Sequence, residues 1–132
     1  MDKVLRCMGL LCLMCIVVLV SCTPKPRKPL KVVSRDSGAM IELCVGDQIE
    51  LVLDANPSTG YQWEVVEGGH VMQQAGEPEF KPDSPALGAG GKVTMSFKAV
   101  AVGEERLRLA YRRSWEEGVA PEATFELYIV VK

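Results

Sequence analysis

Apolar and polar residues alternate along several short segments of the chain, and each of these segments is predicted to be a β-strand. In residues 47–54, the side chains of Ile49, Leu51 and Leu53 share one face of the segment. A period of two residues is typical of a strand with one buried face. The same period, or a shorter apolar run, marks the other predicted strands at residues 31–34, 39–43, 61–66, 71–75, 93–99, 106–111 and 125–131.

Stretches rich in glycine, proline and polar residues separate these strands, and such residues favour turns. They occupy residues 55–60, 67–69, 81–91, 102–104 and 113–121. No segment of the domain keeps the apolar period of a helix over ten or more residues. Seven or eight short strands in about 100 residues predict an all-β fold, a two-sheet β-sandwich of the immunoglobulin-like kind.

The N-terminus has a different pattern, because residues 7–20 form an unbroken run of fourteen uncharged, mostly hydrophobic residues behind Lys3 and Arg6. A short basic region, an apolar run and small residues in this order predict a signal peptide. The alternative is a transmembrane anchor. Fourteen helical residues span about 21 Å, however, and the hydrocarbon core of a membrane is about 30 Å thick, so the signal peptide is favoured.

The end of the apolar run, Leu19-Val20-Ser21-Cys22, resembles the lipobox of bacterial lipoproteins, in which the cysteine is acylated and starts the mature chain. The resemblance implies lipidation of Cys22, with acyl chains such as palmitate that give stable membrane anchoring. We therefore expect an exported protein, lipid-anchored to the bacterial cell envelope. The outer membrane is favoured because no acidic residue follows Cys22. The predicted organisation is a lipoprotein signal peptide at residues 1–21, an acylated cysteine and tether at 22–31, and an immunoglobulin-like domain at 32–132.

Charge is divided unevenly between this tether and the domain. Lys25, Arg27 and Lys28 give the proline-rich tether three positive charges, which suit an extended spacer and attract anionic lipid weakly. From Lys31 onward the chain has ten basic and sixteen acidic residues, a net charge of −6. The whole chain carries a net charge of −2, and its isoelectric point of about 5.5 argues against a nucleic-acid partner.

Few residues of the domain suit catalysis or metal binding. With Cys22 lipidated and the signal peptide removed, Cys44 is the only thiol, and its place between Leu43 and Val45 predicts a small buried side chain outside any disulfide. His70 is the only histidine, so no zinc site is expected, although a Cys44–His70 pair stays open as a minor alternative. No set of carboxylates or Ser-His-Asp residues has a usable spacing. We predict no catalytic residues, no metal and no cofactor, and a protein that is not an enzyme.

Three predicted loops carry residues suited to recognition, which loops on a rigid sandwich often perform. The first is Asn56-Pro57-Ser58-Thr59-Gly60-Tyr61, where the proline fixes φ and the glycine supplies a conformation that other residues resist. The second contains Gly88-Ala89-Gly90-Gly91 and lacks the lysine and helix of a phosphate-binding loop. The third is Arg113-Ser114-Trp115, and Arg and Trp are enriched at interface hot spots.

Together the three motifs resemble the loops of chagasin-like inhibitors of papain-family cysteine proteases. That family has an Asn-Pro-Thr-Thr-Gly-Tyr/Phe loop, a central glycine-rich loop and an Arg-Pro-Trp loop, which occur here in the same order at compatible spacing. The resemblance implies an immunoglobulin-like sandwich and reversible inhibition. It places Ser58, Thr59 and Gly60 in the middle of the protease cleft, Gly88–Gly91 along the non-primed subsites, and Arg113 with Trp115 on the primed side.

Two positions depart from the family pattern. Ser58 replaces a threonine and keeps the hydroxyl group, whereas Ser114 replaces a proline, so we expect a less preorganised third loop and weaker binding. Trp63 alternates with Tyr61 on a predicted strand and is expected to belong to the core. Trp115 stands in a polar loop, where we expect it to contact the protease.

The expected partners are a papain-family cysteine protease and, through the lipid on Cys22, a membrane. No nucleic acid is expected, and the chain is predicted to be monomeric. The alternative function is a non-inhibitory, lipid-anchored envelope module, either an adhesin or an assembly subunit, that uses the same loops on another partner.

Overall fold

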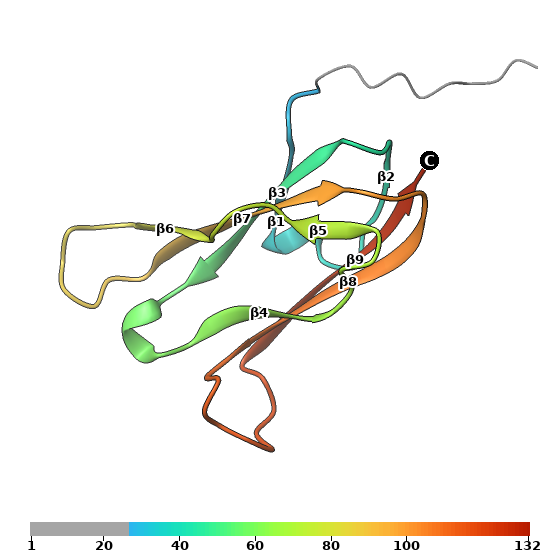
Figure 1. Cartoon of the computed structure of the whole chain (residues 1–132). Helices are drawn as coiled ribbons and strands as arrows, with labels where there is room; N and C mark the ends of the chain where they lie inside the picture. Colours follow the sequence, from blue (N-terminus) through green and yellow to red (C-terminus); the bar gives the residue numbers. More distant parts are fainter. Residues whose placement is uncertain (1–26) are drawn as a thin grey trace, which may run out of the picture.

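Short β-strands make up most of the described chain. The structure is a computed structural model that describes residues 27–132, and the predicted signal peptide, Cys22 and residues 23–26 lie outside the described residues. None of the helices in residues 27–132 is long and apolar enough to cross a membrane. The elements of this region are β1 (Leu30–Val33), η1 (Ser34–Asp36), β2 (Met40–Leu43), β3 (Gln48–Ala55), η2 (Pro57–Thr59), β4 (Gln62–Glu67), β5 (Met72–Gln74), β6 (Glu79–Pro82), β7 (Gly91–Ala99), β8 (Gly103–Arg112) and β9 (Ala123–Val131), where η marks a 3-10 helix (Figure 1).

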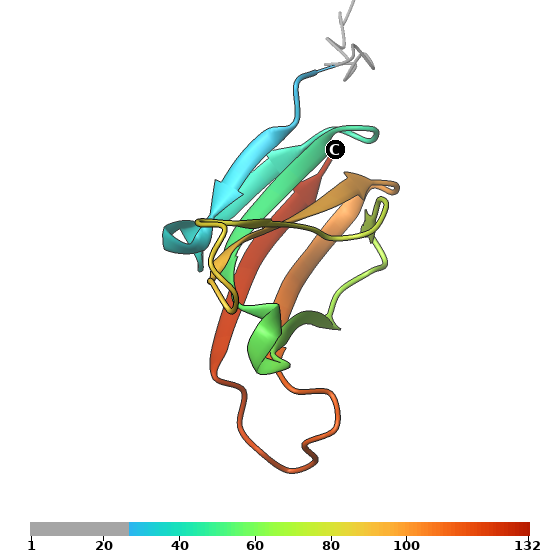
Figure 2. The ribbon, with the colours of Figure 1, turned by 90° about the vertical axis from the view of Figure 1, so that its left-hand side faces the viewer.

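The strands pair into two sheets that face each other. The first sheet has the order β1-β3-β7, with β5 and β6 both paired to the other side of β7, and the second has the order β2-β9-β8-β4 (Figure 2). β1 is parallel to β3 and β2 is parallel to β9, whereas the other pairs are antiparallel. The predicted all-β, immunoglobulin-like two-sheet sandwich is confirmed.

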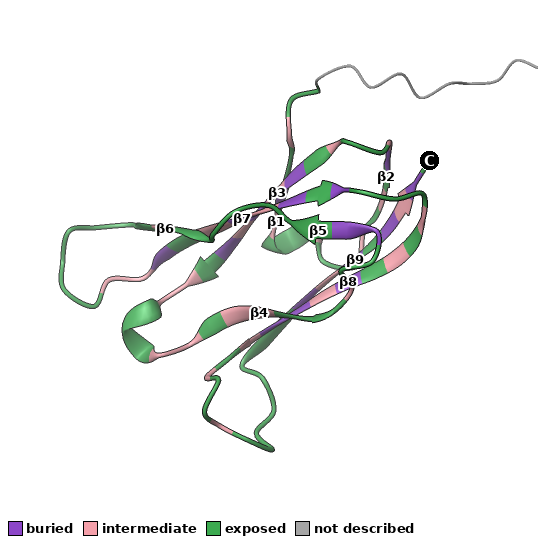
Figure 3. Cartoon of the chain, in the orientation of Figure 1, coloured by how far each residue is buried: buried purple, intermediate pink, exposed green. Residues whose placement is uncertain are grey.

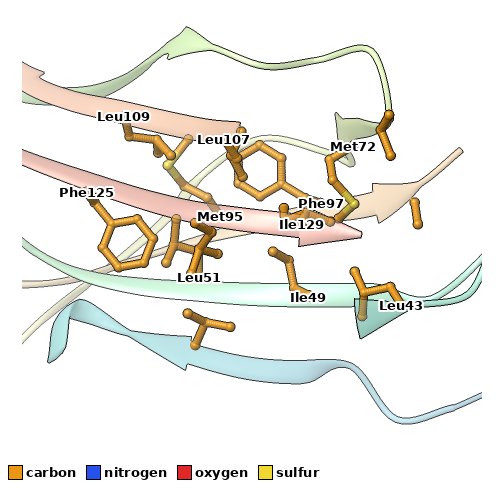
Figure 4. Close-up of a cluster of buried hydrophobic side chains, with 14 of the residues drawn as sticks. Leu43, Ile49, Leu51, Met72, Met95, Phe97, Leu107, Leu109, Phe125 and Ile129 are labelled. Carbon is orange, nitrogen blue, oxygen red and sulfur yellow. The ribbon is translucent and has the colours of Figure 1, made fainter. Parts of the chain in front are cut away.

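The core lies between the sheets and follows the alternation seen in the sequence. Ile49, Leu51 and Leu53 of β3 are fully buried, and they belong to one cluster with Phe97 of β7 and Phe125 of β9 (Figures 3 and 4). In residues 27–132 no polar or charged residue is buried. Because burial of each large apolar side chain stabilises the fold by about 1.5–3 kcal/mol, this core gives the connecting loops a rigid support.

The region of β6 differs from the prediction, which assigned residues 81–91 to a turn. β6 pairs with the first residues of β7, which begins at Gly91. A Cβ atom on Gly91 would lie 2.1 Å from the carbonyl oxygen of Lys81, so only glycine allows the two backbones to approach this closely. Gly91 is therefore part of a paired strand rather than part of the glycine-rich loop.

Cys44 also differs from the prediction. It is half-buried in the turn between β2 and β3, and it is disulfide-bonded. The predicted buried thiol outside any disulfide is therefore wrong. The backbone N–H of Cys44 donates a hydrogen bond of 2.9 Å to the carboxylate of Asp47, which closes the turn.

The strand directions give the domain two distinct ends. β1 and β3 run in parallel away from the point where residues 27–29 enter the domain, so the connection after β3 lies at the opposite end (Figures 1 and 2). β1 begins at Leu30, one residue before the strand predicted at residues 31–34. We call the two ends the tether end, with residues 27–30, 44–47 and 100–102, and the loop end, with residues 56–61, 83–90 and 113–122.

Candidate functional site

The three loops singled out in the sequence lie side by side at the loop end. We call them the central loop (residues 56–61, between β3 and β4), the glycine loop (83–90, between β6 and β7) and the arginine–tryptophan loop (113–122, between β8 and β9). Both views show η2 of the central loop between the other two loops (Figures 1 and 2). The fold therefore brings together segments that are up to about sixty residues apart in the chain.

The central loop is a tight turn held by its own hydrogen bonds. The backbone carbonyl of Asn56 accepts hydrogen bonds from the Thr59 N–H at 3.1 Å and the Thr59 Oγ1 hydroxyl at 2.6 Å. The Ser58 hydroxyl donates to Asn56 Oδ1 at 2.5 Å. Pro57 fixes φ at the start of the turn, and Gly60 ends it with a φ of +81°. Proline, serine and threonine thus form an exposed tip whose hydroxyl groups are engaged within the loop.

An aromatic cluster beneath the central loop fixes the loop on the sandwich. The Asn56 N–H donates a 2.8 Å hydrogen bond to the hydroxyl oxygen of Tyr111 in β8. The ring of Tyr111 stacks on Tyr61 with centroids 5.3 Å apart and packs against Trp63 at 5.0 Å. Trp63 also packs against the core, as predicted, and its indole N–H donates to the carbonyl of Asp54 at 2.9 Å.

Arg113 joins the arginine–tryptophan loop to the central loop. Its Nε donates a 2.9 Å hydrogen bond to the carbonyl oxygen of Thr59, and its guanidinium carbon lies 4.5 Å from the centre of the Tyr61 ring, a cation–π contact. A second guanidinium nitrogen bonds Glu116 at 3.1 Å. These contacts hold Arg113 against its own domain and join the two loops, while its side chain stays 34% exposed.

Trp115 is the exposed aromatic residue of this end. Its side chain is 66% exposed, yet one edge of the indole rests on the central loop, since a Cβ atom on Gly60 would lie 2.3 Å from ring atom Cη2. Gly60 therefore meets two requirements, a positive φ and space for the indole. The remaining indole surface faces solvent beside the tip of the central loop.

Although position 114 is a serine, hydrogen bonds and an ion pair hold the arginine–tryptophan loop in place. The Glu116 N–H donates to the carbonyl of Arg113 at 3.2 Å, and the Glu122 N–H donates to the carbonyl of Tyr111 at 2.9 Å. Together with the Arg113–Glu116 ion pair, these bonds close the loop where a proline would have fixed one φ angle.

The glycine loop contacts the other side of the central loop. Asn56 Nδ2 donates a 3.2 Å hydrogen bond to the carbonyl of Gly88, whose φ is +75°. Ala89 and Gly90 are half-buried beside the strands, whereas Leu87 at the tip is 104% exposed. Glycine at position 88 thus allows the turn that places an apolar side chain in solvent at the tip of the loop.

A charged contact ties the base of the glycine loop to the central loop. The ammonium group of Lys92, at the start of β7, hydrogen-bonds the carboxylate of Asp54 at the end of β3. This hydrogen bond raises the pKa of Lys92 above its ordinary value, against a smaller opposing effect of desolvation. Both side chains are exposed, so the contact adds little stability.

The loop end offers exposed apolar surface for binding. In residues 27–132 no group of three or more His, Cys, Asp or Glu side chains is arranged to hold a metal ion. A cavity of about 340 Å³ opens behind the central loop, and no acid, histidine, cysteine or lysine lines it. What the loop end presents instead is a braced convex tip between two exposed apolar side chains, Leu87 and Trp115.

Sequence reasoning missed two contributors to this surface. Leu87 is the only large apolar residue in a loop otherwise made of small residues, proline and aspartate, and this contrast was a usable signal. Tyr111 was missed because its bond to Asn56 joins residues 55 positions apart and leaves no local pattern.

Comparison with known proteins agrees with this geometry. A family model described as the chagasin family peptidase inhibitor I42 matches residues 42–129. Chagasin from Trypanosoma cruzi is 32% identical over 105 residues, covering 75% of this chain and 94% of chagasin.

Solved structures share the fold. The crystal structure of a cysteine protease inhibitor from Entamoeba histolytica aligns with a TM-score of 0.69 at 24% identity, covering 78% of this chain and 95% of the inhibitor. The structure of PbICP-C in complex with falcipain-2 aligns with a TM-score of 0.51 at 19% identity, covering 80% of this chain and all of PbICP-C. With the family match over most of the domain and the family's three loops assembled at one end, this chain belongs to the chagasin family of peptidase inhibitors.

Proposed function

We propose that this chain is a reversible inhibitor of papain-like cysteine proteases that inserts the loop end into the active-site cleft. The observation that carries the proposal is the joining of the three loops by contacts of Asn56, Arg113 and Trp115. Membership of a peptidase-inhibitor family supports it. So do the two proteins of the same fold, one named a cysteine protease inhibitor and one solved with falcipain-2.

The central loop has the properties of a wedge. Pro57, Ser58 and Thr59 are exposed at its tip, while its backbone and hydroxyl groups are already hydrogen-bonded within the domain. A loop that is ordered before binding loses little conformational entropy when it docks. The wedge therefore fills the cleft and covers the catalytic residues of the protease without any bond to them.

The flanking loops supply the rest of the interface. Leu87 on one side and Trp115 on the other expose apolar surface that a cleft wall can cover. With the central loop between them, the three segments are suited to the roughly 800 Å² per partner of a standard interface. The glycine loop would lie along the non-primed subsites and Trp115 on the primed side.

Titration of papain with the purified protein in which Cys22→Ser removes the acylation site tests this function. We expect stoichiometric loss of peptidase activity, its recovery on dilution, and intact inhibitor on a gel after the incubation. A Met40→Ser variant is a matched control, because Met40 is 70% exposed but lies in β2, away from the loops. Absence of inhibition at micromolar concentration would contradict the proposal and would favour a non-inhibitory envelope module.

We further propose that the mature chain is monomeric, exported and acylated at Cys22. The apolar run at residues 7–20 and the lipobox-like sequence before Cys22 support this proposal. The lipid of such a cysteine is joined to its sulfur through the thioether of a diacylglyceryl group, so a lipidated Cys22 cannot form a disulfide. Mass spectrometry of the N-terminal peptide tests the lipidation. An acylated Cys22 supports the anchor, and an unmodified or disulfide-bonded Cys22 contradicts it.

A further inference from the structure

The turn between β7 and β8 has an unusual composition for a water-facing turn. Val100, Ala101 and Val102 are consecutive, apolar and all exposed, and the side chain of Val102 is 71% exposed. Turns in water favour Gly, Asn, Asp, Ser and Pro, and a run of exposed apolar residues costs solubility unless it serves a function. The contacts described for the loop end give this turn no role, because it lies at the tether end.

Other apolar side chains extend this turn into a larger face. The Gly46 N–H donates to the carbonyl of Ala99 at 2.8 Å, so the β2–β3 turn with exposed Val45 lies directly beside it. Leu30, 45% exposed, pairs with Ile49 at the start of β3. We call Leu30, Val45, Val100 and Val102 the valine face.

The unpaired charges around the valine face have a small positive net charge. Asp47 is paired with Arg27 at 3.5 Å, and Glu42 is paired with Lys132 at 2.8 Å. None of the ion pairs formed within residues 27–132 involves Lys28 or Lys98, both of which are exposed. Glu104 adds one exposed acid, so the electrostatic attraction to an anionic surface is modest and the apolar turns carry most of the contact.

The end of the mature chain that carries the proposed lipid joins the domain at this same end. After Cys22 the chain reaches the described domain at Arg27, which hydrogen-bonds Asp47 of the β2–β3 turn. From Cys22 to Leu30 the chain spans at most about 29 Å when fully extended. A leash this short holds the valine face close to the bilayer at a high effective concentration, so even a weak affinity is sufficient.

We propose that the valine face rests on the surface of an anionic lipid bilayer, with the basic tether residues at its edge. The proposal rests on the membrane attachment put forward above. It orients the domain with its strands rising from the membrane and the three loops facing away. Valine tips inserted among the head groups, together with nearby lysines and arginines, are the features by which peripheral proteins hold such a surface.

Tryptophan quenching by brominated lipid tests this orientation. The full-length acylated protein is reconstituted in vesicles of phosphatidylglycerol and phosphatidylcholine, with or without bromine on the acyl chains of the phosphatidylcholine. We compare Val102→Trp with Val119→Trp, which adds the same indole at an exposed valine of the loop end. Trp63 and Trp115 both belong to the loop half of the domain and supply the background. We expect the added emission to be lost in brominated vesicles for Val102→Trp and retained for Val119→Trp.

The opposite results overturn the proposal. Equal quenching of the two variants, or none in either, excludes a domain seated on its valine face. If the acylated protein self-associates, and the valine face is covered without quenching of Val102→Trp, the face binds a second copy of the chain rather than the membrane.

Two further measurements test the proposed inhibition and the proposed lipid anchor separately from this orientation. Papain inhibition by Val102→Trp, which lies outside the loops, reports on the proposed function alone. The mass of the N-terminal peptide reports on the anchor, and a protein that carries no acyl chain and fails to sediment with vesicles overturns the attachment and this orientation together.

Discussion

Gly60 is constrained by its backbone and by its neighbour at once. Its φ is +81°, and any Cβ atom there would collide with the indole of Trp115. We expect Gly60→Ala to cost about 1–2 kcal/mol from backbone strain and to weaken papain inhibition by at least about tenfold, near 1.4 kcal/mol, because the indole must move. Gly118→Ala is the matched control, since Gly118 has a φ of +72° but no atom within 4 Å of a Cβ. Equal effects on inhibition in the two variants would disprove the role of the collision.

Trp115 and Trp63 divide binding and stability between them. Trp115 is 66% exposed, so Trp115→Ala is expected to weaken inhibition by about 2 kcal/mol or more while the melting temperature stays nearly unchanged. Trp63→Ala removes core packing and the bond to Asp54, and it is expected to lower the melting temperature by several degrees. Inhibition constants and thermal melts of both variants check this division, which is wrong if Trp115→Ala destabilises the fold and spares inhibition.

Arg113 acts through the central loop. Lysine keeps the charge but has neither the Nε donor to the Thr59 carbonyl nor the flat surface over Tyr61. We expect Arg113→Lys to weaken inhibition by about 1 kcal/mol. We also expect it to speed amide hydrogen exchange at Thr59 and Gly60 in the protein without bound protease. Arg112→Lys serves as the control, because Arg112 is exposed and bonds Glu64 on β4. Weaker inhibition with unchanged exchange in Arg113→Lys would contradict this role through the central loop.

At the scale of elements, one carboxylate holds the connection between β4 and β5. Glu105 in β8 accepts hydrogen bonds from the backbone N–H groups of residues 69, 70, 71 and 72. Desolvation alone would raise the pKa of Glu105, but the bonds from Val71, Gly69, His70 and Met72 outweigh it and hold the pKa below its ordinary value of 4.5. The contribution to stability is therefore fully present above pH 4.5 and is lost as the pH falls through the lowered pKa.

Glu105→Gln should thus destabilise the domain at neutral pH by about 1–2 kcal/mol. The difference from the wild type should shrink as the pH falls below 4.5 and through the lowered pKa, where the folded wild-type carboxyl group also becomes neutral. Urea unfolding at a series of pH values measures it, with the exposed neighbour Glu104→Gln as control. A difference that stays constant into acid would show that charge on Glu105 is not what holds the connection.

The elements with a buried face were predictable, and β6 was not. Apolar and polar residues alternate along β3 and β9 because one face of each strand packs in the core. The alternation in the sequence therefore predicts which residues are buried. β6 lies at the edge of the first sheet, where it contributes Phe80 and ends in Pro82, and its other residues face solvent. An edge strand of this kind has no apolar period, and its existence depends on Gly91 admitting the backbone of Lys81.

At the scale of the molecule, the residues of the candidate site were predictable as loops but their joining was not. The proline and glycines of the central and glycine loops carry local turn signals. The bonds Asn56–Gly88 and Arg113–Thr59 connect residues 32 and 54 positions apart, and they depend on the order of strands in two sheets. The family resemblance implies that Arg113 contacts the protease, and the structure adds bonds from its guanidinium group to Thr59 and Glu116.

The separation of the two ends makes a prediction for the anchored protein. Because the loop end and the tether end lie at opposite ends of the strands, attachment to a membrane leaves the loops accessible. We expect the vesicle-bound and the unacylated forms to inhibit soluble papain with the same inhibition constant. A substantially weaker constant for the bound form would place the loops against the lipid.

The hydrogen bonds of the central loop also bear on its survival in a hydrolytic cleft. A protease cuts a segment that it can draw into an extended form with the scissile carbonyl free to accept bonds from the enzyme. Here the carbonyl of Thr59 accepts a hydrogen bond from Arg113, and the carbonyl of Asn56 accepts two from Thr59. Pro57 also holds the backbone in a turn. Cleavage would require these bonds to break first. We therefore expect the loop to stay in its turn inside the cleft and to resist cleavage.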